Sequence, residues 1–484
     1  MSARCALGDK RQWSLQFMSF AFDSDISAPL ARARALAAQA EDEAAKQAYL
    51  AVLRRDPTHF SALNELGTLA YSGGFRSAAR TAYLQAVQHH PGNKIARVNL
   101  ANLLRDEQDP VGARVHYEAA LAIDPDLPEA HQGMAWVLKE LGHEDTHQHW
   151  QKGYSGHAVV SKPYRGTGIE VPLLMLVSAR GGNIPTQLWL NDRLFAVSAL
   201  YAEFYDPGLA LPPHALVVNT IGDADLCDIA LARAEEIVAR STAPVINRPA
   251  RVRVTGRTEI ARRLAAIEGV IAPTIHAMGP AAVLAADDLR FPLLLRRPGF
   301  HNGQHFVYVE NHAALAPAIA CLGGDELLVI QYLNGRGADG MSRKYRVMFI
   351  DGVPYPLHLA ISADWKVHYA TSDMTHNAAY RDEERRFLED MPAILGPRAM
   401  AALAGICATL GLEYSGIDFA LAPNGSVLLF EANATMIVFL PSPDPTWDYR
   451  RRAISDVLQA ATRMLLRHSS RAATAHGSSS KSIS

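Results

Sequence analysis

The stretch Gly416-Ile-Asp-Phe-Ala-Leu-Ala-Pro-Asn-Gly-Ser-Val-Leu-Leu-Phe-Glu-Ala-Asn433 decides the fold of the carboxyl-terminal half of this chain. Its middle holds Asn424-Gly425, the preferred two-residue turn between antiparallel strands, because both positions tolerate a positive φ. If these two residues form the turn, Asp418 on the first strand lies directly opposite Glu431 on the second. The residues around both acids are apolar: Phe419, Leu421, Leu428 and Phe430. The sequence therefore predicts a core hairpin that carries two facing carboxylates.

Two carboxylates placed side by side on a sheet repel each other, and a cation relieves that cost. Asn433 lies two residues beyond Glu431, so it points to the same face of its strand and offers a third oxygen. Mg²⁺ binds one or two carboxylates together with phosphate oxygens and water. We therefore predict that Asp418, Glu431 and Asn433 bind magnesium beside a nucleotide. The alternative is that both acids lie on the solvated face of an edge hairpin.

Segments suited to phosphate precede this hairpin. Phe291-Pro-Leu-Leu-Leu-Arg-Arg297 is predicted to be a strand that ends in two cations, and Phe306 to Glu310 is predicted to return as the next strand. The polar, glycine-containing loop between them offers backbone N–H groups beside arginines, a combination that binds phosphate. Further along, Asp339-Gly-Met-Ser-Arg-Lys-Tyr-Arg346 predicts a basic strand.

An alternating α/β pattern begins after Gly153 and predicts parallel layers. The expected elements are a strand at 171–177, a helix that ends near 205, a strand at 215–220, a helix at 226–240 and a strand at 244–247. Gly181-Gly182 follows the first of these strands. The glycine pair either cradles a phosphate at a helix amino terminus or forms a tight turn.

From about Arg251 to Met436 the sequence resembles the ATP-grasp carboxylate–amine ligases, and residues 157–250 look like the domain that precedes theirs. The resemblance rests on an acid on one strand followed by Glu-x-Asn on the next, met here by Asp418, Glu431 and Asn433. It implies that these residues hold two Mg²⁺ ions, or Mn²⁺ in their place, on the phosphates of ATP. The residues that the resemblance implies for ATP binding are Arg257, Arg297, Gly299, His301, Asn302, Gly303, Gln304, Glu326, Gln331, Tyr332, Leu333, Asp339 and Lys344.

The sequence departs from that family at the phosphate-binding lysines. Family members usually place two lysines on the ATP phosphates, but this chain has no lysine between Lys162 and Lys344. Arg257 and Arg297 stand where those lysines are expected, and arginine keeps the charge and adds a bidentate fork.

The reaction implied by the resemblance begins when a substrate carboxylate attacks the γ-phosphorus of ATP, and an amine then displaces phosphate from the acyl phosphate. Arg343, Lys344 and Arg346 are the expected catalytic residues. We expect Arg343 and Arg346 to share one strand face and to clamp the substrate carboxylate or the oxyanion. Two alternatives stay open: a kinase that phosphorylates an alcohol, and a noncatalytic adaptor with a degenerate nucleotide site.

The amino-terminal part of the chain contains an internal repeat. Pro57, Pro91 and Pro125 are spaced by 34 residues, since 91 − 57 and 125 − 91 are equal, and the positions before them also match. The matching sets are Ala45, Ala79 and Ala113, then Tyr49, Tyr83 and Tyr117, then Leu66 and Leu100. This pattern resembles the tetratricopeptide repeat, in which proline ends the second helix of each pair. Such stacks bind segments of other chains, so we expect a peptide substrate or a protein partner there.

Composition limits the class of partner. The chain has 484 residues, with 47 Lys+Arg against 49 Asp+Glu, so it lacks the basic field that nucleic acids or anionic membranes require. Its four cysteines (Cys5, Cys227, Cys321 and Cys407) fit neither a disulfide framework nor paired zinc ligands. We expect a soluble, cytoplasmic protein, because no apolar run spans a membrane and the amino end lacks a secretory pattern.

The expected fold class is multidomain, α followed by α/β. The expected order is an extension at 1–27, tetratricopeptide-like repeats at 28–156, a pre-ATP-grasp α/β domain at 157–250, an ATP-grasp domain at 251–468 and a disordered tail at 469–484. The identities of the carboxylate and the amine do not follow from the sequence. ATP-grasp ligases often form homodimers, which leaves the oligomeric state open.

Overall fold

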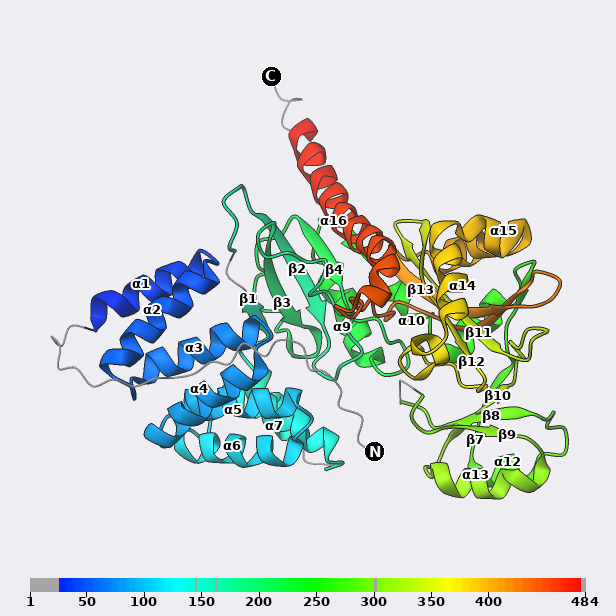
Figure 1. Cartoon of the computed structure of the whole chain (residues 1–484), viewed down its shortest axis with the longest axis horizontal. Helices are drawn as coiled ribbons and strands as arrows, with labels where there is room; N and C mark the ends of the chain where they lie inside the picture. Colours follow the sequence, from blue (N-terminus) through cyan, green and yellow to red (C-terminus); the bar gives the residue numbers. More distant parts are fainter. Residues whose placement is uncertain (1–25, 144–145, 162–163, 300–302, 480–484) are drawn as a thin grey trace. The chain divides into compact units, whose positions relative to one another are not determined.

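The computed structural model describes residues 26–143, 146–161, 164–299 and 303–479. The chain divides into two compact units, Met1–Ala158 and Val159–Ser484. The first unit is helical, and the second contains three β-sheets with helices packed on them (Figure 1). The two expected α/β domains lie together in the second unit.

The first unit is a stack of antiparallel helix pairs that resembles tetratricopeptide repeats. Its helices are α1 (Ser27–Ala38), α2 (Asp42–Arg55), α3 (Phe60–Ser72), α4 (Arg76–His89), α5 (Lys94–Asp106), α6 (Pro110–Ile123), α7 (Pro128–Glu140) and α8 (Thr146–Tyr154). The three repeated prolines each lie two residues beyond a helix end, after α2, α4 and α6. This placement agrees with proline as the end of the second helix of each pair.

The repeated small and aromatic residues form the core of this stack. Ala45, Ala79 and Ala113 are all fully buried, and the equivalent tyrosines are at most 3% exposed. A side chain on Gly67 would meet the ring of Tyr83 at 2.6 Å, so glycine is needed there for the helices to approach. The 34-residue pattern therefore marks the residues that pack neighbouring helices together.

The second unit begins with a sheet of order β1-β3-β2-β4-β5. The strands are β1 (Val159–Ser161), β2 (Val171–Val177), β3 (Phe195–Tyr201), β4 (Leu216–Asn219) and β5 (Val245–Ile246), followed or flanked by α9 (Asp228–Val238) and α10 (Pro249–Arg253). The predicted helix ending near Tyr205 is wrong, because Phe195–Tyr201 is a strand parallel to β2. Most of its seven residues are apolar or small, and a run this short fits a helix as well as a strand.

An antiparallel sheet of order β7-β10-β8-β9 follows. Its strands are β7 (Ile275–Met278), β8 (Leu293–Arg296), β9 (Phe306–Val309) and β10 (Leu327–Gln331), and its helices are α12 (Pro280–Ala285) and α13 (Leu315–Leu322). Both helices cover the same face of the sheet (Figure 1). The opposite face is left for the site described below.

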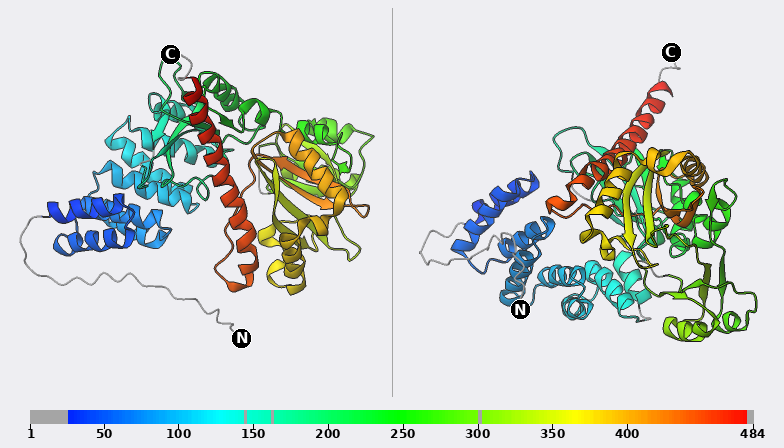
Figure 2. Two further views of the ribbon diagram at one scale, coloured as in Figure 1. Left: turned by 90° about the horizontal axis from the view of Figure 1, so that it is seen from above. Right: turned by 45° about the vertical axis from the view of Figure 1, so that its right-hand side comes forward.

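The third sheet has the order β12-β11-β13-β14-β6. Its strands are β6 (Val270–Ile271), β11 (Ser342–Ile350), β12 (Val353–Ser362), β13 (Tyr414–Leu421) and β14 (Val427–Asn433), packed with α11 (Arg257–Leu264), α14 (Ala378–Glu389) and α15 (Met391–Leu410). One face contributes Tyr345, Val347, Phe349, Ile417, Phe419 and Leu429 to an apolar core. Helices α14 and α15 cover that face (Figure 2).

Helix α15 is long and apolar enough to cross a membrane by length and composition alone. Met391, Leu403 and Leu410 on this helix are buried in the core of the third sheet. These residues of α15 are therefore part of that core.

Helix α16 (Arg451–Ser479) contacts both the first and the third sheet. It ends at Ser479, within the segment 469–484 that the sequence predicts to be a disordered tail. Alanine has the highest helix propensity, and Ala472, Ala473 and Ala475 extend the helix there.

The first and third sheets are joined by buried polar contacts. The side chain of Asn247 donates to Tyr414 O (2.8 Å) and accepts from Tyr414 N–H (2.9 Å). Trp189 stacks on the ring of Tyr414 with centroids 5.2 Å apart. These contacts hold the edge of the first sheet beside β13.

Candidate active site

The hairpin of β13 and β14 pairs Asp418 with Glu431, but not through the predicted turn. The turn has three residues, Pro423 to Gly425: Ala422 N–H donates to Ser426 O (2.8 Å) and Gly425 has φ +77°. This turn alone would shift the pairing by one residue. The structure restores it with a β-bulge, because Phe419 pairs with Leu429 while Asp418 pairs with Glu431.

The bulge decides which way Glu431 points. Val427 and Leu429 face the apolar core, so strict alternation would send residue 431 to the core as well. The extra residue, Phe430, reverses the alternation, and Ala432 takes the next core position. Bulges often redirect side chains next to functional sites. Here the bulge brings the carboxylate of Glu431 to the face that carries Asp418.

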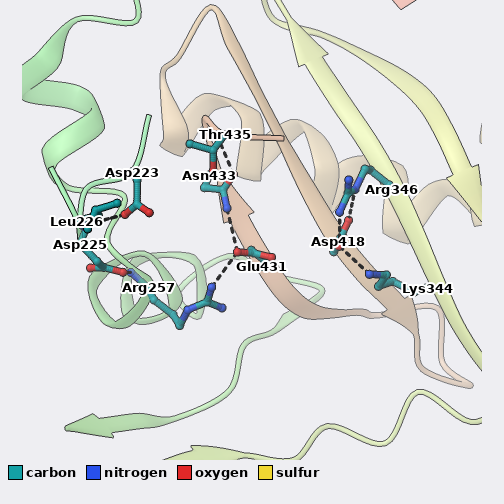
Figure 3. Close-up of polar contacts among 10 residues, drawn as sticks. All are labelled: Asp223, Asp225, Leu226, Arg257, Lys344, Arg346, Asp418, Glu431, Asn433 and Thr435. Carbon is teal, nitrogen blue, oxygen red and sulfur yellow. Dashed lines mark hydrogen bonds and ion pairs between the residues drawn. The ribbon is translucent and has the colours of Figure 1, made fainter. Parts of the chain in front are cut away.

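Asp418 is buried and held by two basic side chains of β11. Arg346 donates from Nε to Oδ1 (2.6 Å) and from Nη2 to Oδ2 (2.8 Å). Lys344 Nζ lies 3.1 Å from Oδ2 (Figure 3). The negative charge of Asp418 is therefore balanced within the chain.

Glu431 has a different set of partners. Arg257, the first residue of α11, donates from Nη2 to Oε1 (2.8 Å), and Asn433 Nδ2 donates to the same oxygen (3.0 Å). Figure 3 shows the two acids on one hairpin, each directed to its own basic partner. Among the residues that the structure describes, none donates a hydrogen bond to Glu431 Oε2.

Both carboxyl groups are held in the charged form. Burial alone would raise the pKa of Asp418, but the charges of Arg346 and Lys344 outweigh it and hold that pKa well below its usual range. Burial likewise opposes ionisation of Glu431, and Arg257 outweighs it, so the pKa of Glu431 is lowered. Both acids are therefore carboxylates at neutral pH.

A cavity of about 160 Å³ lies between the second and third sheets, with these acids at one end. Its apolar walls are Ile275, Leu294, Phe306, Ile330 and Leu429, and its basic residues are Arg257, Arg296, Lys344 and Lys366. An apolar slot that leads to a group of cations suits a flat ring joined to a chain of phosphates.

Several predicted ligands line this cavity. They are Arg257, Gly303, Gln331, Tyr332, Leu333, Arg343, Lys344, Asp418 and Glu431. Gln331 ends β10, and Tyr332 and Leu333 follow it. All three line the cavity, and the resemblance implies that they bind ATP. Arg346 and Asn433 line a neighbouring cavity instead.

Arg297 does not lie in the cavity, and its neighbour Arg296 does. Alternation along β8 places Leu294 and Arg296 on the cavity face, so Arg297 points away, toward Gly324. Arg296 is 7% exposed. Its burial, together with the charge of Arg257, lowers the pKa of the Arg296 guanidinium to about 10. This environment would favour an anionic ligand.

Arg343 and Arg346 do not share a strand face, contrary to the prediction. Residues three apart on a strand point to opposite sides. Arg343 binds Glu383 of α14 (Nε to Oε1, 2.6 Å) and Asp339 (Nη2 to Oδ2, 2.9 Å). These two acids raise the pKa of Arg343. Arg343 therefore holds the segment before β11 in place and reaches only the edge of the cavity.

The remaining predicted ligands lie elsewhere. Gly299, Gln304, Glu326 and Asp339 do not line the cavity, and Glu326 is exposed at the start of β10. His301 and Asn302 lie outside the residues that the structure describes. The sequence reasoning missed Arg296 and Lys366. Strict alternation along β8 would have found Arg296, whereas Lys366 lies in an irregular segment where no pattern marks it.

A larger cavity of about 610 Å³ adjoins the first one. Arg296, Lys344, Asp418 and Glu431 line both cavities. The larger cavity also reaches Gly182 and Asn183, in the loop between β2 and β3. The pair of acids thus lies where the smaller cavity meets the larger one.

The donor set suits a divalent cation only with help from a ligand. Among the described residues, no group of three or more His, Cys, Asp or Glu side chains could hold a metal ion. Asp418 and Glu431 supply two carboxylates on one face of the hairpin. Asn433 supplies an amide oxygen that in this structure accepts hydrogen bonds from Thr435 N–H (2.9 Å) and Thr435 Oγ1 (3.1 Å). That set fits Mg²⁺, which completes its coordination with phosphate oxygens and water.

Comparison with known proteins identifies no family for the chain. No protein-family model matches it, and no curated protein matches it significantly. Similar solved structures include a MamA structure of MSR-1 (18% identity, 27% of this chain and 78% of that chain, TM-score 0.24). Others are residues 41 to the end of MamA from Desulfovibrio magneticus RS-1 (19%, 27% and 73%, TM-score 0.25) and the first tetratricopeptide-repeat domain of Spaghetti bound to an HSP90 peptide (15%, 24% and 93%, TM-score 0.24).

Proposed function

We propose that this chain is an ATP-dependent ligase that activates a carboxylate as an acyl phosphate and joins it to an amine. The observation that carries the proposal is the placement of Asp418 and Glu431 between two cavities. The smaller cavity would take ATP, with the base in the apolar slot and the phosphates on the cations. The larger cavity would take the carboxylate and the amine.

The chain's own residues would act mainly by alignment and charge neutralisation. Lys344, Arg296 and Arg257 would hold the triphosphate, and Asp418, Glu431 and Asn433 would hold Mg²⁺. The metal would neutralise phosphate charge as it builds up during transfer. Arg257 donates a hydrogen bond to Oε1 of Glu431 in this structure. When Glu431 binds Mg²⁺, the Arg257 side chain would move toward a phosphate.

The proposed reaction has two steps. An oxygen of the substrate carboxylate attacks the γ-phosphorus, the bond to the β-phosphate oxygen breaks, and ADP leaves. The amine nitrogen then attacks the acyl carbon, the carbon–oxygen bond to phosphate breaks, and phosphate leaves as the amine loses a proton. Arg346 lies beside Asp418 and would stabilise the oxyanion of this second step.

Hydroxylamine trapping tests the proposal. The full chain is incubated with ATP, Mg²⁺ and hydroxylamine, together with a panel of amino acids, peptides and small carboxylic acids. The ligase produces a hydroxamate and ADP with at least one member of the panel. A phosphorylated alcohol would instead establish the kinase, and unchanged ATP throughout would support the adaptor.

We also propose that the helical stack binds a peptide or protein, in a cytoplasmic setting. Val111 and Val115 lie one turn apart on α6 and are 64% and 57% exposed. Exposed apolar side chains at this spacing suit a protein contact. The double variant Val111→Asp with Val115→Asp should leave ATP turnover unchanged and abolish partner binding; a loss of turnover would contradict this separation of roles.

A further inference from the structure

Arg450 is a buried cation that the proposed reaction does not use. It ends the 3-10 helix η5 (Pro445–Arg450) and is 8% exposed. Its Nε lies 3.2 Å from Oε1 of the fully buried Glu384, and its guanidinium carbon lies 4.1 Å from the ring centroid of Tyr369. The acid and the ring fix the position of the side chain.

The two terminal nitrogens of Arg450 have no acceptor. Within the described part of the chain, neither Nη1 nor Nη2 donates a hydrogen bond, although Arg450 lines the larger cavity. Glu384 is already engaged by Leu359 N–H (3.2 Å) and by the hydroxyls of Tyr369 and Tyr449. The nitrogen of Arg450 that is buried without a hydrogen bond is Nε, whereas Nη1 and Nη2 are open to the cavity. A guanidinium fork that is open to a cavity matches a carboxylate.

Apolar side chains surround this fork. Met436, Ile437 and Trp447 line the same cavity, together with Phe439 and Leu440. Phe439 and Leu440 are 68% and 61% exposed, so their surfaces are open to a ligand. The cavity therefore presents one fixed positive fork next to an apolar surface.

A continuous wall connects Arg450 to the reaction centre. The ring centroid of Tyr369 lies 4.9 Å from that of His358, and His358 pairs with Arg346 across β11 and β12. Arg346 in turn holds Asp418. A ligand bound at the fork thus lies along a wall that leads to the acids.

We propose that the amine substrate is an α-amino acid with an apolar side chain, an assignment that rests on the proposed ligase function. Arg450 binds its α-carboxylate, and Phe439, Leu440 and Trp447 contact its side chain. The amino group points into the larger cavity, where it attacks the acyl carbon and releases phosphate, and its proton passes to water.

Calorimetric binding of leucine and leucinamide to the full chain, in the presence of ADP and Mg²⁺, tests the site. Leucine should bind at least tenfold more tightly than leucinamide, which lacks the carboxylate. Arg450→Lys should weaken leucine binding at least tenfold, because lysine keeps the charge beside Glu384 but lacks the fork. Arg451→Lys is the matched control, since Arg451 is exposed and pairs with Asp448.

Equal binding of leucine and leucinamide, or leucine binding by Arg450→Lys within twofold of the wild type, would overturn the assignment. If Arg450→Lys unfolds, the double variant Arg450→Met with Glu384→Gln removes both buried charges and should also fail to bind leucine.

Hydroxamate formation tests the ligase proposal without the amino-acid site. Hydroxylamine replaces the amine substrate, so the assay requires the acyl phosphate but no amino acid bound at Arg450. Arg450→Lys should form hydroxamate at the wild-type rate and lose at least tenfold in amide formation with leucine. A matching loss of hydroxamate would show that Arg450 binds the activated carboxylate, which contradicts the assignment. If the wild type forms no hydroxamate but leucine binding depends on Arg450, the ligase proposal fails and the amino-acid site stands.

Discussion

Arg346 donates two hydrogen bonds to Asp418, at 2.6 and 2.8 Å, at the point where the two cavities meet. Both side chains come from the centre of the third sheet, where Arg346 on β11 lies opposite Asp418 on β13. The pair therefore stabilises the third sheet and also belongs to the proposed site. Its contribution to stability can be measured separately from its contribution to activity.

Asp418→Asn should destabilise the second unit by about 3–5 kcal/mol, because it leaves Arg346 and Lys344 without a balancing charge in a buried position. Denaturant unfolding of the second unit measures the loss. Asp339→Asn is the control: Asp339 is about half exposed, and Arg343 keeps Glu383 as its partner, so stability should hardly change. Equal effects of the two substitutions would contradict this account of the pair.

Arg296→Leu should weaken ATP binding about tenfold or more, because it removes a buried cation from the phosphate end of the slot. Arg297→Leu, its neighbour in sequence, should leave the affinity unchanged because its side chain points away. A fluorescent ATP analogue measures both dissociation constants. If the two variants lose affinity equally, the strand alternation does not define the phosphate site.

His358 should make the protein sensitive to acid. Burial, with the charge of Arg346, lowers the pKa of His358 well below 6.5 in the folded state. In the unfolded chain, His358 binds a proton near pH 6.5, whereas in the folded chain it stays neutral at that pH. The free energy of unfolding is therefore highest above pH 6.5 and decreases as the pH falls.

His358→Gln should therefore lose less stability than the wild type between about pH 7 and about pH 5. Thermal unfolding at several pH values measures the difference. His276→Gln, at an exposed position on β7, should follow the wild type. A parallel loss in all three proteins would show that His358 is not the source.

Gly67→Ala should destabilise the helical stack by about 1–3 kcal/mol through overpacking, because the new methyl group would meet the Tyr83 ring at 2.6 Å. The higher helix propensity of alanine would offset part of this loss. Gly92→Ala is the control, since nothing lies within 4 Å of its added methyl group. Circular dichroism at the helix band follows both, and equal melting temperatures would contradict close packing at Gly67.

The sequence predicted most of the features that depend on local periodicity. The 34-residue spacing located Ala45, Ala79 and Ala113 in a helical stack, because helix packing repeats with the sequence. Strand alternation likewise placed Glu431 and Asn433 on the same side of β14. By contrast, β3 was missed because its short run of apolar and small residues fits a helix as well as a strand.

The facing acids were predicted correctly by reasoning that contains two compensating errors. The two-residue turn at Asn424-Gly425 was wrong, and so was the assumption of a regular ladder. A bulge depends on packing against α15 and the rest of the core, which no local pattern reveals. The assignment of Arg297 to the phosphate site was wrong for a similar reason. The sequence does not show which side of β8 faces the cavity, and Arg296 lies on that side.

The extra residue at Phe430 makes this hairpin tolerant of some mutations and intolerant of others. A point substitution at Phe430 changes one side chain, and deletion of Phe430 would leave a regular ladder in which Glu431 still lies opposite Asp418. A one-residue insertion before Glu431, by contrast, would exchange the two sides of β14 from Glu431 onward. Glu431 would then enter the apolar core beneath α15, and the inserted residue would take its place in the cavity. Insertions in this segment should therefore be far rarer than substitutions.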